Sequence, residues 1–357
     1  MDNLRFEIFD SKKNLEEQRR LFKDCFPETD GDPIQGKEHY MWKFHSFPIE
    51  GDKSWEYATY IGDEMVGYYA AIPYRYKIGN IHTSVGMVCD VMTSSHHRGQ
   101  GIFTKLGRYS TGELANHVPI TMGYPIRKPV IPGHLKVGWK IAYEMPLYMK
   151  FLKFNSILAS KHVGFLAYVM NPFLSIYNWV VKIGGDKSFV CKVFTRIDDV
   201  EGYSDLVEKW RKELPNTLDK NLDFSRWRYG APNRNYIFIG SYNKSGVLVG
   251  FSACRYVIRE SVPSLCILDY IVLKNYRSCL GSIMSRLTSL AKEMGAEVLM
   301  TMMSRVSASN YQLIRSGFIM SPFKFYLIIK NLNNKLADDE LYDERKWHLM
   351  WVDCDDL

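Results

Sequence analysis

Apolar and polar positions alternate along this chain in two successive runs, each with the same order of predicted elements. Period-two alternation in the first run predicts strands at 6–9, 55–61, 65–76, 84–93, 119–123 and 141–151. Helical spacing predicts helices or helical turns at 15–26, 39–44, 101–115 and 133–137. Strands and helices mixed in this way predict an α/β fold with a mixed (α+β) sheet.

The second run repeats this order. Its predicted strands fall at 189–197, 236–242, 247–257, 265–273, 298–302 and 325–329. Its predicted helices fall at 203–213, 224–229, 281–294 and 310–315. A last strand is expected at 347–352, after a polar and acidic stretch.

Shared landmarks indicate that the two runs are copies of one unit. Asp269 to Arg277 repeats the interval from Asp90 to Arg98, and Gly317-Phe318 follows Gly138-Trp139 at the same displacement. Further pairs in the same order are Trp42 with Trp227 and Gly67 with Gly250. We therefore predict two tandem domains, 1–153 and 188–330, separated by an apolar helical insertion at 154–187 and followed by an acidic tail at 331–357.

The amino-acid composition is that of a folded globular protein. The chain has 357 residues, of which 46% are hydrophobic and 24% charged, as in ordinary globular proteins of two domains. The net charge of +7 is not gathered in runs, which fits an anionic cofactor better than nucleic acid. Seven scattered cysteines without a C-x-x-C pair favour a reducing cytoplasm over a disulfide framework or a zinc site. The amino terminus lacks the apolar core of a signal peptide.

Residues 163–181 carry no charge, which is close to the length of a membrane span. Asn171-Pro172 at the centre predicts a break, because proline removes a helix hydrogen bond. We therefore expect two short apolar helices or a helix and a turn, as a buried or substrate-lining insertion in a protein that is recovered without detergent. A transmembrane span is not expected, and a peripheral membrane contact is the open alternative.

The loop Arg98-Gly99-Gln100-Gly101 lies between a predicted strand and a predicted helix. Glycines let an anion approach the backbone, and the amides that begin the helix point toward it. The pattern therefore indicates a phosphate site, and the alternative is an ordinary strand–turn–helix connection.

The order of elements, this loop and the closing Gly-Trp or Gly-Phe resemble the GNAT acyltransferase superfamily. Arg98, Gly101 and Phe103 match the marked positions of its Gln/Arg-x-x-Gly-x-Gly/Ala motif, although Phe103 replaces a small residue. The resemblance implies acetyl-CoA or another acyl-CoA as cosubstrate, no metal, and direct transfer without a covalent enzyme intermediate. It implies cofactor contacts from Val91, Met92, Thr93, Arg98, Gly99, Gln100, Gly101, Ile102 and Phe103. The second copy lacks these glycines, so we expect only the first to bind acyl-CoA.

Three residues are candidates for general acid or general base catalysis. His134 stands where many members of the family have a tyrosine, four residues before the closing glycine, and the alternative is that it caps the short helix or stacks on Trp139. Tyr124 follows the strand on the far side of the expected splay and is a candidate for the acceptor site. Asp90 is a candidate base, although Asp269 in the degraded copy favours a structural hydrogen bond.

The resemblance implies an N-acyltransferase, most simply an N-acetyltransferase acting on a small amine. One alternative is an aminoacyl-tRNA-dependent peptidyltransferase of tandem type, which the intact loop disfavours. Another is an acyl-CoA-binding or scaffold protein without turnover. The sequence indicates neither the acyl chain length nor the oligomeric state.

Overall fold

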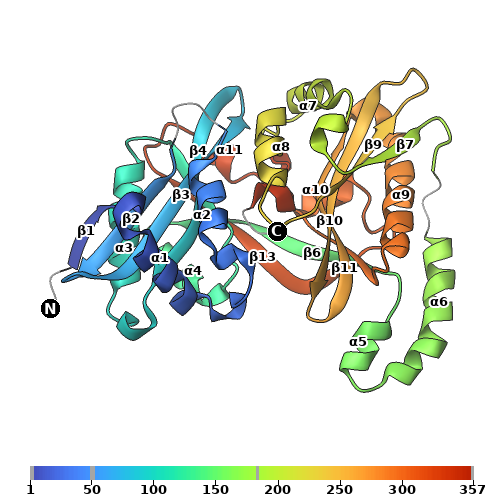
Figure 1. Cartoon of the computed structure of the whole chain (residues 1–357). Coiled ribbons are helices and arrows are strands. Elements are labelled where there is room, and N and C mark those ends of the chain that lie inside the picture. The colour runs from blue at the N-terminus through green and yellow to red at the C-terminus, as the bar shows by residue number, and fades with distance from the viewer. Residues whose placement is uncertain (1–3, 49–52, 182–184, 355–357) are drawn as a thin grey trace. The chain divides into compact units, whose positions relative to one another are not determined.

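A computed structural model describes residues 4–48, 53–181 and 185–354. The chain forms two compact units (Figure 1). Unit 1 consists of 1–143, 230–234 and 326–343, and unit 2 of 144–229, 235–325 and 344–357. Each unit combines parallel and antiparallel strands with flanking helices, which confirms the predicted α/β class.

Unit 1 is built on a sheet in the order β1, β2, β3, β4, β5. All neighbours are antiparallel except β4 and β5, which are parallel. The strands are β1 (Leu4–Ile8), β2 (Trp55–Ile61), β3 (Glu64–Ile78), β4 (Ile81–Thr93) and β5 (Ile120–Gly123). Its helices are α1 (Ser11–Cys25), α2 (Lys37–His45), α3 (Ile102–Leu114), α4 (Ile131–Lys136) and α11 (Asp338–Leu341).

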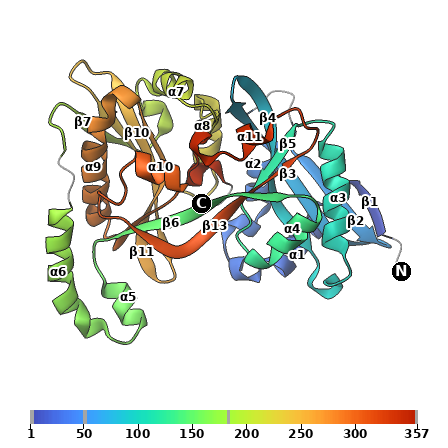
Figure 2. The ribbon, with the colours of Figure 1, turned by 180° about the vertical axis from the view of Figure 1, so that it is seen from behind.

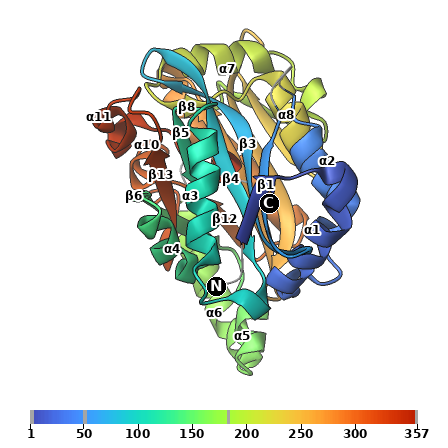
Figure 3. The ribbon, with the colours of Figure 1, turned by 90° about the vertical axis from the view of Figure 1, so that its left-hand side faces the viewer.

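Helices cover both faces of this sheet (Figure 3). On one face α3 packs so closely that a Cβ at Gly67 would meet Leu106 at 3.1 Å, so only glycine fits there. The opposite face of β3 carries Tyr68, whose ring contacts Phe9 and Phe44 beside α1 and α2. Strand alternation thus divides the apolar residues between two cores.

Unit 2 repeats the arrangement with β6 (Lys140–Phe151), β12, β11, β10, β9 and β7 in that order (Figure 2). Its other strands are β7 (Val190–Phe194), β8 (Thr217–Leu218), β9 (Ile237–Tyr242), β10 (Leu248–Arg259), β11 (Val262–Val272) and β12 (Val298–Met302). The helices are α5 (Asn155–Ser160), α6 (Ala167–Val180), α7 (Tyr203–Lys212), α8 (Leu222–Tyr229), α9 (Leu280–Glu293) and α10 (Arg305–Asn310).

Each of the two runs contributes its final strand to the unit that is formed mainly by the other run. Residues 147–151 of β6 pair with β12 of unit 2, whereas residues 328–331 of β13 (Ile319–Asn331) pair with β5 of unit 1. The predicted domain 1–153 includes β6, and the predicted domain 188–330 includes most of β13. In the structure, each of these strands instead pairs with a strand from the other predicted domain.

Equivalent hydrogen bonds recur at the landmarks. Ser94 N donates to Val66 O in unit 1, and Leu273 N donates to Val249 O in unit 2. The turns at Gly138 and Gly317 also match, with φ of +95° and +86° and the next amide donating back five residues. These correspondences support the predicted duplication.

Three local predictions were wrong. The helix expected at 310–315 lies at 305–310, and 311–317 forms turns instead. No strand forms at 347–352, where only isolated bridges and a 3₁₀ turn occur. Asn171-Pro172 does not interrupt the apolar segment, because α6 continues through Pro172.

Candidate functional site

The loop from Arg98 to Gly101 leads from β4 into α3 and leaves its backbone accessible. Gly99 and Gly101 have left-handed φ angles of +80° and +77°, and no atom lies within 4 Å of the position a Cβ would take. All four loop residues are exposed. The backbone is therefore open to a ligand on the side where side chains would otherwise project.

The helix that follows offers unpaired donors to such a ligand. No side chain caps the start of α3, and its first turn has no acidic residue. The first amides of a helix lack partners within it, and the helix dipole places partial positive charge there. Together with Arg98, this end of α3 suits a phosphate or pyrophosphate.

Asp24, at the end of α1, fixes the approach to this loop. It accepts hydrogen bonds from Ser95 N at 2.8 Å and from Ser95 Oγ at 2.6 Å. Burial raises the pKa of Asp24, but these bonds, with His96 and Arg98 nearby, outweigh it, and the pKa lies below its usual value. An ionised Asp24 thus holds the 3₁₀ turn before the loop.

Strands β4 and β5 separate just before the loop. Their parallel pairing covers Gly86 to Val88 and ends there, while β4 continues to Thr93. The pairing of β4 with β3 has a register shift between Cys89 and Met92, at a bulge where Asp90 has a φ of +48°. Val91, Met92 and Thr93 therefore lie on a part of β4 where its pairing with β5 has ended.

Asp90 at this bulge is held by an ion pair. Its Oδ1 lies 2.9 Å from Lys43 Nζ of α2, and both side chains are nearly buried. The corresponding aspartate of unit 2, Asp269, makes a buried pair with Lys220 at 2.6 Å. The recurrence favours the structural interpretation of Asp90 over a free catalytic base.

Tyr124 lies directly after β5, on the far side of the splay from β4, and is buried. The loop after it is tied to the end of α1, because Arg127 Nη1 donates to Cys25 O at 2.8 Å. Cys25 Sγ in turn donates to Thr93 O at 3.3 Å. The structure thus connects Tyr124 and the end of β4 through α1.

His134 is enclosed by aromatic rings. It packs edge to face against Phe103, with centroids 5.0 Å apart, and against Trp139 at 5.3 Å. Burial lowers the pKa of His134 to about 4, so the ring is neutral at neutral pH. The contact with His134 also explains why the motif position that is usually occupied by a small residue is occupied by Phe103 here. The geometry favours the packing alternative, and the catalytic role remains a prediction.

Gln18 and Arg19 of α1 are further candidate site residues that the sequence pattern did not predict. Gln18 is fully buried and Arg19 is 8% exposed, and Arg19 Nε donates to Gln18 Oε1 at 2.6 Å. Within the described part of the chain, Arg19 Nη2 and Gln18 Nε2 have no hydrogen-bond partner. The sequence feature that could have identified them is their position: two polar residues lie on the apolar face of the helix, between Leu15 and Phe22.

The nearby carboxylates do not pair with Arg19. Glu56 accepts 2.5 Å hydrogen bonds from Tyr40 and Tyr68, and Asp90 pairs with Lys43. Burial lowers the pKa of Arg19, partly offset by the charges of Asp90 and Glu56. Arg19 is therefore a buried cation with donor capacity to spare.

The corresponding loop of unit 2 is closed. Residues 274–279 form a 3₁₀ turn that leads directly into α9, without a left-handed glycine. Cys279 and Leu280 are buried, and a Cβ at Gly250 would meet Cys279 Sγ at 2.9 Å. No backbone is left open here as it is at Gly99 and Gly101.

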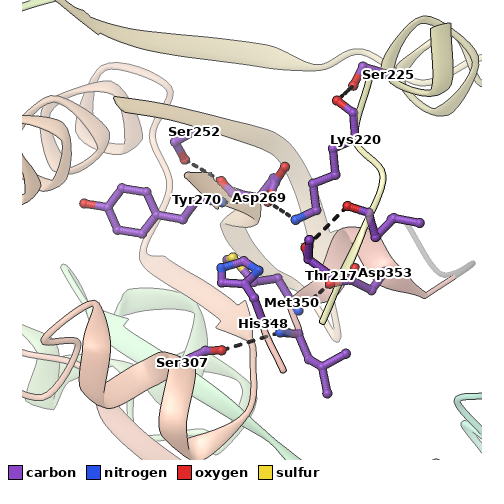
Figure 4. A network of polar contacts seen from close by, with 12 residues as sticks. Thr217, Lys220, Ser225, Ser252, Asp269, Tyr270, Ser307, His348, Met350 and Asp353 are labelled. Atoms are coloured by element: carbon purple, nitrogen blue, oxygen red, sulfur yellow. Dashed lines mark hydrogen bonds and ion pairs between the residues drawn. The ribbon is translucent and has the colours of Figure 1, made fainter. Parts of the chain in front are cut away.

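The C-terminal segment, which we define as residues 347–354, lies where β11 and β12 have separated (Figure 4). Met350 bridges to Met303 after β12, Leu349 O accepts from Ser304 N, and His348 Nε2 lies 3.1 Å from Tyr311 Oη. Every residue of the segment is buried. Asp353 of the predicted acidic tail is therefore buried, while Asp355 and Asp356 lie outside the described residues.

Among the described residues, no three His, Cys, Asp or Glu side chains are arranged to hold a metal ion. In the same part of the chain, no helix has both the length and the apolar character needed to span a bilayer.

Known proteins resemble this chain in sequence and in fold. Residues 11–142 match the acetyltransferase (GNAT) domain family. The match covers α1 to β5 and the open loop, and the predicted resemblance is confirmed for this GNAT segment. No curated protein sequence matches the chain.

Solved structures share the fold at low sequence identity. A probable N-acyltransferase of unknown function from Enterococcus faecalis has a TM-score of 0.67 at 11% identity, covering 92% of this chain and 73% of its own. A GCN5-related N-acetyltransferase from Anabaena variabilis gives 0.65 at 14%, covering 93% and 73%. Saccharomyces cerevisiae N-myristoyltransferase with bound myristoyl-CoA gives 0.61 at 11%, covering 98% and 84%.

Proposed function

We propose that the GNAT segment is an acyl-CoA-dependent N-acyltransferase that transfers an acetyl group to a small amine. The observation that carries this proposal is the open Gly99–Gly101 backbone at the uncapped start of α3, directly after the separated part of β4. The description of the matching family and the fold of the similar structures support it.

The residues of this chain would divide the binding of acyl-CoA between them. Amides of Gly101, Ile102 and Phe103, with Gly99 and Gln100, would hold the pyrophosphate, and Arg98 would add charge. The backbone of Val91, Met92 and Thr93 would orient the pantetheine and the thioester carbonyl. The cosubstrate itself supplies an activated acyl group, so the protein's task is to position it, polarise the carbonyl and move a proton.

Proton transfer is most simply assigned to Tyr124. Asp90 is already paired with Lys43, and His134 is enclosed by Phe103 and Trp139, whereas Tyr124 lies at the separated end of β5. A tyrosine there would protonate the departing thiolate. Tyr124→Phe should lower kcat while leaving the Kd for coenzyme A within about twofold.

A polar acceptor is supported by the spare donors of Gln18 and Arg19. Arg19 donates to Gln18 Oε1 and Ile34 O, but within the described residues its buried Nη2 has no partner, and such a donor costs free energy unless a ligand supplies an acceptor. A small amine that also bears a carboxylate would satisfy both donors. The closed loop of unit 2 supports binding of a single coenzyme A per chain.

The deciding experiment combines calorimetry with coenzyme A and a free-thiol assay of acetyl-CoA with a panel of amines. One equivalent bound together with amine-dependent thiol release is the expected result. Binding without turnover on any amine would instead indicate an acyl-CoA-binding protein, and no binding would refute the proposal. Replacing acetyl-CoA by myristoyl-CoA tests the length of the acyl chain.

A further inference from the structure

Helix α6 of unit 2 has its polar side facing the protein. Asn171 and Asn178, seven residues apart, form a polar stripe on one face of the helix, whereas Ser175 is exposed and its hydroxyl donates to Asn171 O of the same helix. Asn171 Oδ1 accepts from Phe154 N at 2.9 Å, and its Nδ2 donates to Asn155 Oδ1 at 2.7 Å. Asn178 Nδ2 donates to Phe151 O at 2.8 Å. The polar stripe therefore anchors α6 to the end of β6 and the start of α5.

The opposite side of α6 is apolar and exposed. Val169, Phe173, Ile176 and Val180 follow the same spacing on that face, and each is at least 60% exposed. Trp179 and Tyr168, at 76% and 87%, flank them. Only Ala167 of this helix is buried. A surface helix of a globular protein normally has the reverse polarity, so these residues mark an interaction surface.

The charge around the helix narrows the choice of partner. No aspartate or glutamate occurs between Glu144 and Asp186, whereas this stretch contains Lys150, Lys153, Lys161 and Lys182. Lys153 and Lys161 are exposed beside the helices. An exposed apolar stripe with Trp and Tyr beside it, in a stretch of chain whose only charged residues are lysines, complements the surface of an anionic bilayer. A protein partner would not require an acid-free stretch of this length.

Helix α6 has 14 residues, too few to cross the hydrocarbon core, so it would lie along the membrane surface. Figures 1 and 2 show α5 and α6 together at one end of unit 2, where they contact the edge of its sheet through Ser156 and Asn178. Such a position lets the apolar stripe enter the headgroup region while the sheet stays in water.

We propose that the α5–α6 pair is a peripheral membrane-binding element for anionic phospholipid. The apolar stripe of α6 enters the boundary between headgroups and acyl chains, and Lys153 and Lys161 contact phosphate. This proposal takes up the open alternative of a peripheral membrane contact in place of a buried or substrate-lining insertion. It does not depend on the acyl-transfer proposal.

Co-sedimentation of the full chain with vesicles tests this proposal. Vesicles of phosphatidylcholine mixed with phosphatidylglycerol should bind the protein, and pure phosphatidylcholine vesicles should bind it more weakly. Phe173→Glu combined with Ile176→Glu should reduce binding at least about tenfold, because both apolar insertions are lost. Lys153→Glu should reduce binding to the mixed vesicles by about fivefold and leave pure phosphatidylcholine unaffected.

Ile258→Glu is the matched control, because Ile258 is 67% exposed in the same unit and Phe173 is 69% exposed. It should leave vesicle binding within about twofold, and equal melting temperatures would show that the variants fold. Three results would overturn the proposal. The first is that the protein sediments with neither kind of vesicle, and the second is that the α6 double variant binds vesicles as well as the wild type. The third is that the wild type self-associates and Phe173→Glu abolishes this, since a second copy of the chain would then cover the stripe.

Discussion

Lys43 Nζ lies 2.9 Å from Asp90 Oδ1, at the bulge where β4 has left its pairing with β5. The ion pair joins α2 to a residue with a left-handed backbone, immediately before the strand segment proposed to bind the thioester. Because such a backbone is strained for most residues, the pair helps to hold the shape of this segment.

Asp90→Asn should therefore lower the free energy of unfolding by about 3 kcal/mol, because Lys43 loses the buried carboxylate charge with which it pairs. Asparagine tolerates the left-handed backbone, so the change isolates the charge. Urea denaturation measures it, and Lys13→Gln, which breaks an exposed pair with Asp10, should cost under about 0.5 kcal/mol. Unchanged stability with lost turnover would instead identify Asp90 as a base.

Gly101→Val should abolish coenzyme A binding in calorimetry, because its side chain would project where the backbone is now open. Gly62→Val is the control for backbone strain, since Gly62 also has a positive φ and open surroundings in a distant turn. Leu280→Val, in the closed loop of unit 2, should leave affinity within about twofold. Two equivalents bound per wild-type chain would contradict the assignment.

The lowered pKa of His134 predicts a pH dependence of stability. The folded-state pKa of about 4 lies below the usual 6.5, so the unfolded chain binds the proton more readily. The resulting stabilisation is fully present above pH 6.5 and is lost as the pH falls toward 4, an effect of about 3 kcal/mol. His134→Phe should remove this component from the difference between wild-type and variant stability curves.

The same variant tests the two roles of His134. Phenylalanine keeps the packing between Phe103 and Trp139 but cannot carry a proton, so turnover should stay within about threefold if the role is packing. A loss of tenfold or more with unchanged coenzyme A affinity would establish the acid or base role instead.

Arg19→Met should lower kcat/KM for a carboxylate-bearing amine such as an amino acid by on the order of 10- to 100-fold, the cost of a lost charged hydrogen bond. The corresponding amino acid amide should be affected far less. Arg20→Met is the matched control, because Arg20 follows on the same helix with its side chain 77% exposed. Because Arg19 also donates to Gln18 Oε1 and Ile34 O, the melting temperature is measured alongside, and a large loss of stability would indicate a structural role.

Trp351→Ala should destabilise unit 2 by about 3 to 5 kcal/mol, because the ring is fully buried in the C-terminal segment. Trp179→Ala removes an equally large ring from α6 of the same unit, but one that is 76% exposed, and should cost under about 0.5 kcal/mol. Thermal melts of the two variants provide the comparison. Equal effects would show that the segment does not stabilise the fold.

The sequence determined the elements and the open loop, because both depend on local chemistry. The alternation along 55–61 and 65–76 became β2 and β3, and Arg98 to Gly101 became a loop with two left-handed glycines. The spacing of Gly138 and Gly317 likewise anticipated two equivalent turns. Local backbone preferences of this kind survive in the folded protein whatever surrounds them.

Tertiary structure decided which strand pairs with which and which polar residues are enclosed. The residues of β6 alternate correctly for a strand, but alternation does not specify a neighbour, and β6 joins β12 while β13 joins β5. Whether His134 meets solvent or two aromatic rings, and whether the apolar stripe of α6 is covered, depends on residues distant in the chain. Burial and pairing are properties of the packed chain, so the sequence pattern alone could not supply them.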